Sequence, residues 1–445
     1  MKRILSLMII GCTLLLTACD NYLDIQPTGS VIPSSLAEYR ALIARSYKTA
    51  SGMSDRGMAC LRSDEMQVRN EEFDQNAYKD IECWNDLEAN PSTLSFGWEK
   101  YYQVLFISTQ IIDNKGDIKD GNQIDIDQLV GEAYLLRAYM HFLLVNLYGQ
   151  PYTKPDALET KSIPLKLDTD LEKLLKRNTV FEVYTSIQLD LDEARKLITT
   201  SEWEAGYSYR FNTTSVDAFQ SRLSLYKGEW QDALTAAKAA LAKKSTLENF
   251  NDASANLPNL FQSVENITAL EMPLSNSVNN ASLATPSFLA LYTDGDLRPD
   301  KYFAKSDANG FRKSQKGGNN NYLCTFRTGE LYLNAAEAAA QSDLLPEART
   351  HLLNLMEKRY TPEAYTEKVT AVNAMSKEAL ISEILNERAR ELAFEGHRWF
   401  DLRRTTRPRL TKVLDGKTFV LEENDARYTL TIPKEAIEAN PGLLN

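Results

Sequence analysis

Apolar side chains recur at steps of three and four residues along most of the chain beyond residue 35. The first such run is Leu36, Tyr39, Leu42, Ile43 and Tyr47. This spacing places apolar side chains on one face of a helix. The same pattern predicts long helices at about 96–113, 126–147 and 180–198, and two more between 216 and 243. The chain is therefore expected to be all-α, or mostly helical.

The spacing of alanines predicts that several helices form pairs of the tetratricopeptide-repeat type. Gly228 and Trp230 precede Ala233, Ala237 and Ala240, and small residues at these steps let paired helices approach closely. Similar pairs are predicted, with decreasing regularity, at 327–355, at 132–147 with 180–197, and at 363–374 with 377–394. Repeat-type helices are thus expected over about 126–243 and 327–404. Ordinary alanine-rich helical hairpins are the alternative.

Two long stretches lack this periodicity. Residues 55–95 and 245–325 are rich in Asn, Ser, Asp, Gly and Pro, interrupted by single aromatic residues. Long irregular stretches in a compact protein are usually functional or disordered. They are expected to form the face that meets a ligand or partner. Near the end, 418–421 and 428–432 predict a small β-hairpin.

The N-terminus predicts export and lipid attachment. Lys2 and Arg3 precede an apolar run at 4–16, which is too short to span a membrane comfortably. The following Leu-Thr-Ala-Cys sequence resembles the bacterial lipobox, in which the cysteine thiol receives lipid. Residues 1–18 are thus expected to be removed as a signal peptide, 19–35 to form a lipidated tether on Cys19, and 36–445 to form one helical domain. An ordinary signal peptide with an incidental Cys19 is the alternative.

The net charge limits the classes of partner, and the cysteines raise the question of a disulfide. Loss of the leader reduces 50 lysines and arginines to 48, against 61 acidic residues, a net charge of about −13. This charge argues against nucleic acid as a partner. An exported protein can form a disulfide, and Cys60 with Cys83 would close a loop of moderate length. Unpaired thiols at Cys60, Cys83 and Cys324 are an equally open alternative.

The densest motif lies at residues 386–404. Glu387, Glu391 and Glu395 are four residues apart, so a helix would project all three from one face, with Arg388 and Arg390 on adjoining rows. We expect an ion-pair network that locks the helix, which ends at a left-handed glycine after Glu395. A glycosidase-like carboxylate pair is the alternative. The arginines would lower the carboxylate pKa values, the wrong direction for a general acid.

This motif closely resembles the signature of SusD/RagB-like proteins. Residues 19–27, 136–149 and 432–441 are similar to the lipoprotein start, the first repeat helix and the closing segment of that family. The resemblance covers essentially the whole mature chain. It implies a surface-exposed outer-membrane lipoprotein with four tetratricopeptide-type pairs that passes oligosaccharides, or peptides in some branches, to a SusC-type TonB-dependent transporter. It also implies that the chain is not an enzyme.

The signature does not locate the ligand site, so candidates come from residue chemistry. Aromatic faces stack on sugars, and Asn, Asp and Arg bond their hydroxyls. The candidates are Asp64, Arg69, Trp84 and Asn85 in the first irregular stretch, and Tyr302 and Tyr322 in the second. Trp84 is the best stacking candidate, whereas Trp98 is expected in the core. A glycoside hydrolase and a repeat scaffold without a small ligand remain the alternatives from other classes.

No cofactor or metal is expected. His141, His351 and His397 are scattered and do not have ligand spacing, and there is no phosphate loop or nucleophile elbow. The sequence 294–296, Asp-Gly-Asp, lacks the twelve-residue calcium-loop pattern and predicts a turn. Whether calcium binds and which glycan or peptide is the ligand both stay open.

Overall fold

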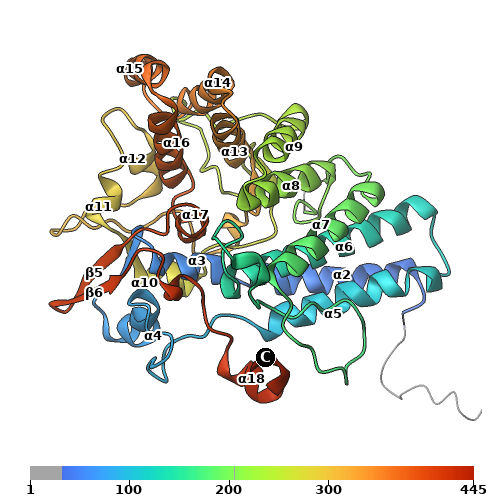
Figure 1. Ribbon diagram of the computed structural model, residues 1–445. Helices are drawn as coiled ribbons and strands as arrows, with labels where there is room; N and C mark the ends of the chain where they lie inside the picture. The colour runs from blue at the N-terminus through green and yellow to red at the C-terminus, as the bar shows by residue number, and fades with distance from the viewer. Residues whose placement is uncertain (1–32, 205, 445) are drawn as a thin grey trace, which may run out of the picture.

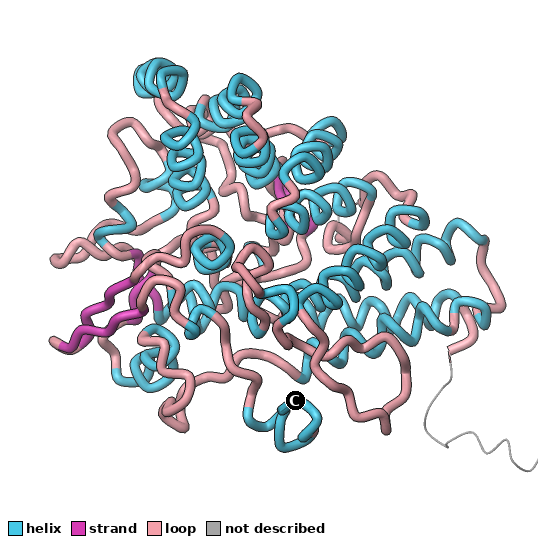
Figure 2. Tube along the Cα trace, viewed as in Figure 1, coloured by secondary structure: helices cyan, strands magenta, loops and turns pink. Residues whose placement is uncertain are grey.

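The computed structural model describes residues 33–204 and 206–444, and most of them lie in helices (Figures 1 and 2). The helices are α2 (Leu36–Ser51), α3 (Asp55–Ala59), α4 (Glu72–Glu82), α5 (Glu99–Asp113), α6 (Gln123–Tyr148), α7 (Val180–Leu197), α8 (Thr213–Lys227), α9 (Trp230–Lys243), α10 (Asn276–Ala281), α11 (Pro286–Leu289), α12 (Arg298–Tyr302), α13 (Thr328–Gln341), α14 (Leu345–Met356), α15 (Pro362–Ala374), α16 (Lys377–Glu391), α17 (Arg398–Arg404) and α18 (Lys434–Ala439). The strands are β1 (Met66–Val68), β2 (Asn266–Thr268), β3 (Ser282–Ala284), β4 (Phe326–Arg327), β5 (Leu410–Leu414) and β6 (Lys417–Leu421). The strands form two-stranded pairs, so the prediction of a mostly helical fold is confirmed.

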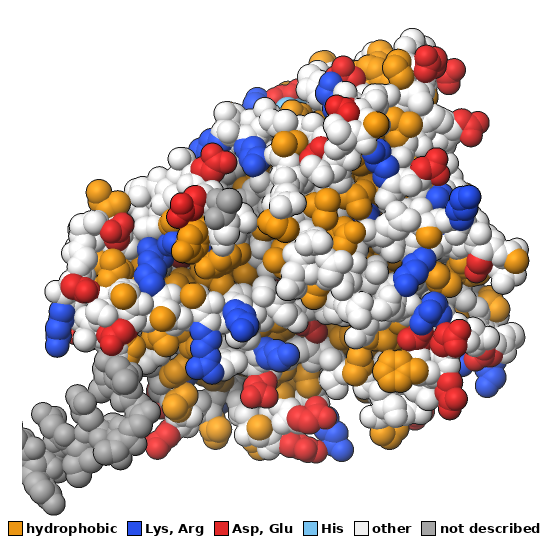
Figure 3. Space-filling view, turned by 180° about the vertical axis from the view of Figure 1, so that it is seen from behind, with side chains coloured by type: hydrophobic (Ala, Val, Ile, Leu, Met, Phe, Trp, Pro, Cys, Tyr) orange, Lys and Arg blue, Asp and Glu red, His pale blue; other side chains and the backbone are white. Residues whose placement is uncertain are grey.

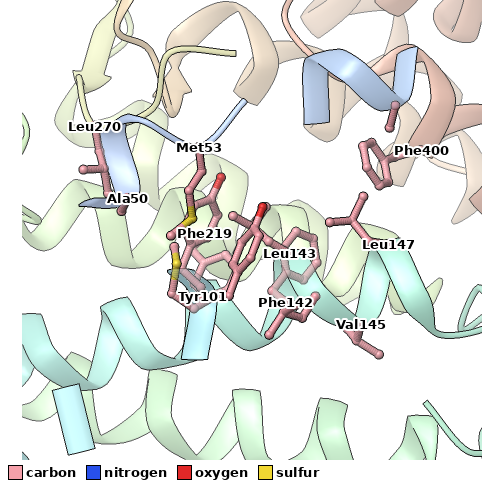
Figure 4. Packing of buried hydrophobic residues seen from close by; sticks show 14 of the residues in the cluster. Ala50, Met53, Tyr101, Phe142, Leu143, Val145, Leu147, Phe219, Leu270 and Phe400 are labelled. Atoms are coloured by element: carbon pink, nitrogen blue, oxygen red, sulfur yellow. The ribbon is translucent and has the colours of Figure 1, made fainter. Parts of the chain in front are cut away.

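Helix α6 is the centre of the N-terminal half. It packs against α5 and α7 and also touches α2. From Gln128 to Tyr148 every residue except Tyr134 is buried, as expected for a helix that is apolar on nearly all sides. In Figure 4 its Phe142 lies beside Phe219 of α8, and their ring centroids are 5.4 Å apart in an edge-to-face arrangement. This core carries the helices that border the candidate site.

Small residues bring the later helices together. Helix α8 packs on α9, and α13 packs on α9, α14 and α16. Ala233 and Ala237 of α9 and Ala336 of α13 are fully buried in one shared cluster. The predicted pairs at 228–240 and 327–355 therefore form. The pair predicted at 363–374 and 377–394 is wrong, because α15 packs mainly on α14 and α16 mainly on α13.

The first irregular stretch contains more helix than expected. Residues 55–95 include α3, β1 and the 11-residue helix α4. The apolar pattern of α4 is weak, because the only apolar residues on its buried face are Ala77, Tyr78 and Ile81. The rest of the helix is mostly acidic or amide residues, so the sequence did not predict it. The second stretch holds only short elements. The two stretches meet where β1 pairs antiparallel with β3.

The C-terminal hairpin forms with a different partner. Strand β6 pairs with the preceding β5, whereas the predicted partner at 428–432 follows a short 3-10 turn at Ala426–Tyr428. Asp415 and Gly416 join β5 to β6, and both have positive φ, 49° and 73°. Asp-Gly is a preferred pair in such two-residue turns because both positions need a left-handed backbone.

Helix α16 ends at Glu391, before the predicted glycine cap. The chain then turns through Phe394 and Gly396, which have φ of 60° and 75°. A Cβ at Gly396 would lie 2.9 Å from the Cβ of Arg56, so glycine is needed there for close approach as well as for conformation. Glu395 therefore lies outside the helix that carries Glu387 and Glu391.

A buried network of ten charged side chains surrounds this helix end. Its cations are Arg298, Arg327, Arg359, Arg390 and Lys316, and its carboxylates are Asp296, Glu265, Glu387, Glu391 and Glu395. Glu391 is the centre, because it accepts from Arg298 at 3.2 Å, Arg327 at 2.8 Å and Arg359 at 2.9 Å. These arginines come from α12, β4 and the turn after α14. The predicted ion-pair network is confirmed.

The cations keep these carboxylates ionised. Burial alone would raise the pKa of Glu387, but the guanidiniums of Arg298 and Arg390 lower it to about 2. Burial likewise opposes ionisation of Glu391, and Arg359 with Arg327 outweighs it and holds the pKa well below the usual range. These groups are inaccessible and ionised, so they do not form an acid–base pair for a substrate.

Glu391→Ala should lower the free energy of unfolding by roughly 3–5 kcal/mol, because it leaves three buried guanidiniums without their shared partner. Urea denaturation followed by circular dichroism measures this loss. Glu367→Ala, at an exposed position on α15, is the matched control and should change stability little. Equal stability of the two variants would contradict a structural role for the network.

Glu65 is a different kind of buried acid. Its Oε1 accepts the Phe394 amide at 2.7 Å, while its Oε2 has no partner among the described residues. Burial raises the pKa of Glu65 to about 8. The folded state therefore keeps a proton that an unfolded glutamic acid loses near pH 4.3. Between the pKa of the unfolded chain and that of the folded protein, the contribution of Glu65 to the free energy of unfolding therefore decreases as pH rises.

Glu65→Gln should remove this pH dependence, because glutamine is neutral and can still accept the amide hydrogen. We expect the melting temperature of the variant to exceed that of the parent by more at pH 8 than at pH 5. Thermal melts at both pH values test this. Glu88→Gln, at an exposed position, should show no such widening. If the difference in melting temperature between Glu65→Gln and the parent is the same at both pH values, Glu65 is ionised in the folded protein.

Candidate functional site

Two of the three aromatic residues predicted to contact a ligand, Trp84 and Tyr302, are buried. Trp84 is 1% exposed, and its indole donates to the carbonyl of Arg62 at 2.9 Å. Tyr302 has no exposed surface, and the Lys316 ammonium lies 3.8 Å from its ring centroid. Their placement on a ligand face was therefore wrong. An isolated aromatic residue in a polar segment still gains most by burying its large apolar surface.

The polar candidates already have partners. Asp64 forms two 2.7 Å hydrogen bonds with Arg398. Arg69 pairs with Asp74 at 2.7 Å, and the Asn85 amide donates to Asp80 at 2.9 Å. These contacts stabilise the folded stretch.

Tyr322 is partly exposed on the short turn at Asn320–Tyr322. Trp84 and Asn85 do border a hollow of about 590 Å³, but the indole adds almost no surface to it.

No disulfide joins Cys60 to Cys83. Both are buried thiols, as is Cys324, so the unpaired alternative holds. Burial raises the pKa of Cys83 to about 12, which keeps the thiol protonated and unreactive. The first stretch is therefore held by packing and hydrogen bonds.

A row of aromatic side chains follows one face of α5. Trp98, Tyr102 and Phe106 are four residues apart and partly exposed, whereas Tyr101 and Leu105 on the neighbouring face are buried. The expectation that Trp98 is a core residue was therefore incomplete, because its ring packs on the core and also reaches the surface. The rings of Trp98 and Tyr102 are 5.0 Å apart at a 35° tilt.

Two adjoining hollows border this row, and together we call them the α5 groove. The larger lobe, about 860 Å³, lies between α5, residues 164–175 and α18, which faces α5 in Figure 1. The smaller, about 390 Å³, lies between residues 52–58, 94–101 and 275–278. Both are lined by Ser95, Trp98 and Glu99, so they meet at the start of α5. Each has a volume typical of small-molecule sites.

The smaller lobe lies where the two irregular stretches come together. Its loop at 94–98 is held by Asp55, which accepts from the Gly97 amide at 2.6 Å and from the Tyr101 hydroxyl at 3.0 Å. A Cβ at Gly97 would lie 2.8 Å from the Asp55 carboxylate, so glycine permits this contact. Burial raises the pKa of Asp55, and its two donors oppose that rise.

Polar groups border the aromatic row. Glu99 and Gln103 are exposed on α5 beside Trp98, and neither side chain is hydrogen-bonded within the described chain. The Tyr102 hydroxyl donates to the Pro164 carbonyl at 2.8 Å, which fixes its ring. An apolar wall with a few available polar groups suits a sugar, which has both C–H faces and hydroxyls. The sequence signal for this wall was the four-residue spacing of aromatics.

The face seen from behind in Figure 3 carries charges of both signs. Seen from behind, apolar patches lie among basic and acidic side chains without a broad field of one sign (Figure 3). Within residues 33–204 and 206–444, no three His, Cys, Asp or Glu side chains gather closely enough to hold a metal. None of the helices in that part of the chain is long and apolar enough to cross a membrane.

Comparison with known protein families agrees with this architecture. A family model described as "Starch-binding associating with outer membrane" matches residues 21–225, and a model of the SusD family matches residues 271–445. The chain belongs to the SusD/RagB-like family. It is 23% identical over 394 residues to the SusD-like protein P38 of Formosa agariphila, an alignment that covers 73% of this chain and 74% of that protein.

Solved structures show the same fold. A SusD superfamily protein from Bacteroides thetaiotaomicron superposes with a TM-score of 0.76 at 21% identity, covering 92% of this chain and 99% of that one. A protein described as a laminarin-binding SusD-like protein superposes with a TM-score of 0.61 at 18% identity, covering 84% and 92%. Resemblance at this level of identity establishes the fold.

Proposed function

We propose that this chain captures oligosaccharides in the α5 groove and passes them to a SusC-type TonB-dependent transporter in the outer membrane. The aromatic row of Trp98, Tyr102 and Phe106 along an open groove carries the proposal. Residues four apart on a helix are about 6 Å apart along its axis, so successive rings can contact successive sugar units. Glu99 and Gln103 are placed to bond their hydroxyls.

The carboxylates of this chain support ligand binding without catalysis. The glutamate stripe at 387–395 is buried and ionised. In the groove, Glu99 is an exposed side chain at the rim. The family is one of carbohydrate-binding proteins, and we infer that this member acts by holding and releasing its ligand.

A peptide is the second candidate ligand, and one observation favours it. Leu171 and Leu174 line the larger lobe and are 80% and 68% exposed. Exposed apolar side chains beside a groove can contact the apolar side chains of a peptide as well as the faces of sugars.

We further propose that lipid on Cys19 holds the protein to the membrane. The sequence Leu-Thr-Ala-Cys supports the attachment, although Cys19 lies outside the described residues. The chain from residue 19 to the start of α2 would then connect the lipid to the folded domain.

Cys19→Ala should prevent incorporation of radiolabelled palmitate and shift the protein out of the membrane fraction of a Gram-negative host that lacks the transporter. Cys12→Ala, which changes the cysteine inside the leader, is the matched control and should be labelled like the parent. Labelling of Cys19→Ala, or its retention in the membrane fraction, would refute the anchor.

Phe106→Ala should weaken oligosaccharide binding about tenfold, which corresponds to roughly 1.4 kcal/mol of lost stacking. Phe106 borders the groove without belonging to the apolar core, so circular dichroism and the melting temperature should stay close to those of the parent. Phe73→Ala is the matched control, because Phe73 is 77% exposed and lies outside the groove.

Isothermal titration calorimetry against a panel of neutral oligosaccharides and, separately, apolar peptides tests this expectation. Binding of peptides alone would select the second candidate. Equal affinities of Phe106→Ala and Phe73→Ala for a bound ligand would place the site elsewhere.

A further inference from the structure

A second hollow lies apart from the α5 groove and shares none of its lining residues. It has a volume of about 610 Å³ and lies between residues 201–203, Ser208, the start of α8, the end of α9 and residues 261–267. Its lining is unusually polar and includes the hydroxyls of Ser201, Ser208 and Thr213. Three features of this lining indicate the kind of molecule that fits it.

The first feature is a buried acceptor without a donor. Asn266 is 8% exposed, and its Nδ2 donates to the carbonyls of Leu323 at 2.9 Å and Leu260 at 3.3 Å. Its Oδ1 has no partner among the described residues. Exchanging the two amide atoms would place the oxygen against two carbonyls, so the orientation is fixed. An unpaired buried acceptor is costly, and a ligand hydroxyl would satisfy it.

The second feature is a cation without a carboxylate partner. Lys244 is the residue that follows α9, and its ammonium forms no ion pair or hydrogen bond in the part of the chain that the structure describes. Its neighbour Lys243 is occupied, since it bonds Asp217 at 2.7 Å and the Thr213 carbonyl at 3.2 Å. Burial lowers the pKa of Lys244, and the carboxylate of Glu202, which also lines the hollow, opposes this decrease. An anion beside Lys244 would stabilise its charge.

The start of α8 adds to this positive potential. Thr213 and Thr214 open this 15-residue helix and line the hollow, so the positive end of the helix dipole faces it. The Asn212 side chain caps Ser215, which leaves the first turn well ordered.

The third feature is a fixed aromatic wall. The guanidinium of Arg210 lies 3.5 Å from the ring centroid of Trp203, and the indole donates to the Phe211 carbonyl at 2.9 Å. These contacts hold the ring in one orientation. Its remaining surface lines the hollow together with Phe261, which is partly exposed.

We propose that this hollow binds an acidic sugar unit, one that carries a carboxylate or a sulfate ester on a pyranose ring. Lys244 and the first turn of α8 receive the anionic group, Asn266 accepts a ring hydroxyl, and Trp203 with Phe261 contacts the C–H face. The inference rests on the proposed function in taking an oligosaccharide as the ligand. It adds that part of that ligand is anionic and is recognised away from the α5 groove.

The experiment compares acidic probes with neutral ones of the same length. Calorimetry at low salt would use trigalacturonate and its methyl ester, and a sulfated carrageenan tetrasaccharide and its desulfated form. We expect one acidic probe to bind at least about tenfold more tightly than its neutral partner. The pair that shows the preference distinguishes carboxylate from sulfate.

Lys244→Gln should abolish that preference and weaken binding of the acidic probe about tenfold while leaving the neutral probe unchanged. Lys48→Gln, an exposed lysine on α2 that makes no ion pair within the described chain, is the control of equal charge and should keep the preference. Both variants should retain the parent melting temperature, because neither lysine bridges other side chains.

The outcomes separate this inference from the proposed function. Binding of neutral oligosaccharides with no preference for acidic ones would overturn the inference alone. Equal loss in Lys244→Gln and Lys48→Gln would also overturn it, since net charge would then explain the effect. If Lys244→Gln loses the preference for acidic probes while Phe106→Ala binds normally, this hollow is supported as a binding site. The α5 groove is then rejected as the binding site. Absence of binding to these probes, together with absence of binding to the wider panel of neutral oligosaccharides and peptides, would refute both.

Discussion

A buried carboxylate must be matched by cations, and Glu391 imposes this requirement on the rest of the structure. Its two oxygens are shared by Arg298, Arg327 and Arg359, which come from three separate segments. The stretch at 245–325 has little apolar periodicity, so its conformation depends on these charges more than on a continuous hydrophobic face. Removing one partner leaves the others desolvated, and for this reason the network fixes geometry more than it adds stability.

The α5 groove is built differently, on a rigid helix whose one face is core and whose other face is exposed. Tyr101 is buried and Trp98 is shared between core and groove. Asp55 fixes the adjoining loop through Gly97 and Tyr101, so the smaller lobe is shaped before any ligand arrives. A preformed site reduces the ordering cost of binding, which matters for weak ligands such as sugars.

The sequence predicted the long helices well because three- and four-residue spacing follows directly from helix geometry. It misplaced Trp84, because an isolated aromatic residue in a polar segment does not reveal whether it is buried. It placed Trp98 only in the core, because spacing alone cannot tell which face of a helix meets the core and which meets a groove. The charged stripe was recognised, but its cations are brought from up to 93 residues away by tertiary folding, as the bond between Arg298 and Glu391 shows. The Asp415–Gly416 turn was visible in the sequence and was overlooked.

The contact between Arg56 and the turn after α16 also sets an order of folding. The Arg56 guanidinium donates to the carbonyls of Glu395 and Gly396, which lie 339 and 340 residues later. Closing so long a loop comes after local helices have formed, because its entropy must be offset by contacts already made. The contact at Arg56 therefore forms only when nearly the whole chain is present, whereas α2, α5, α6 and α7 can pack on one another earlier. Variants that weaken the Arg56 contact should therefore change the last step of folding more than the formation of the individual helices.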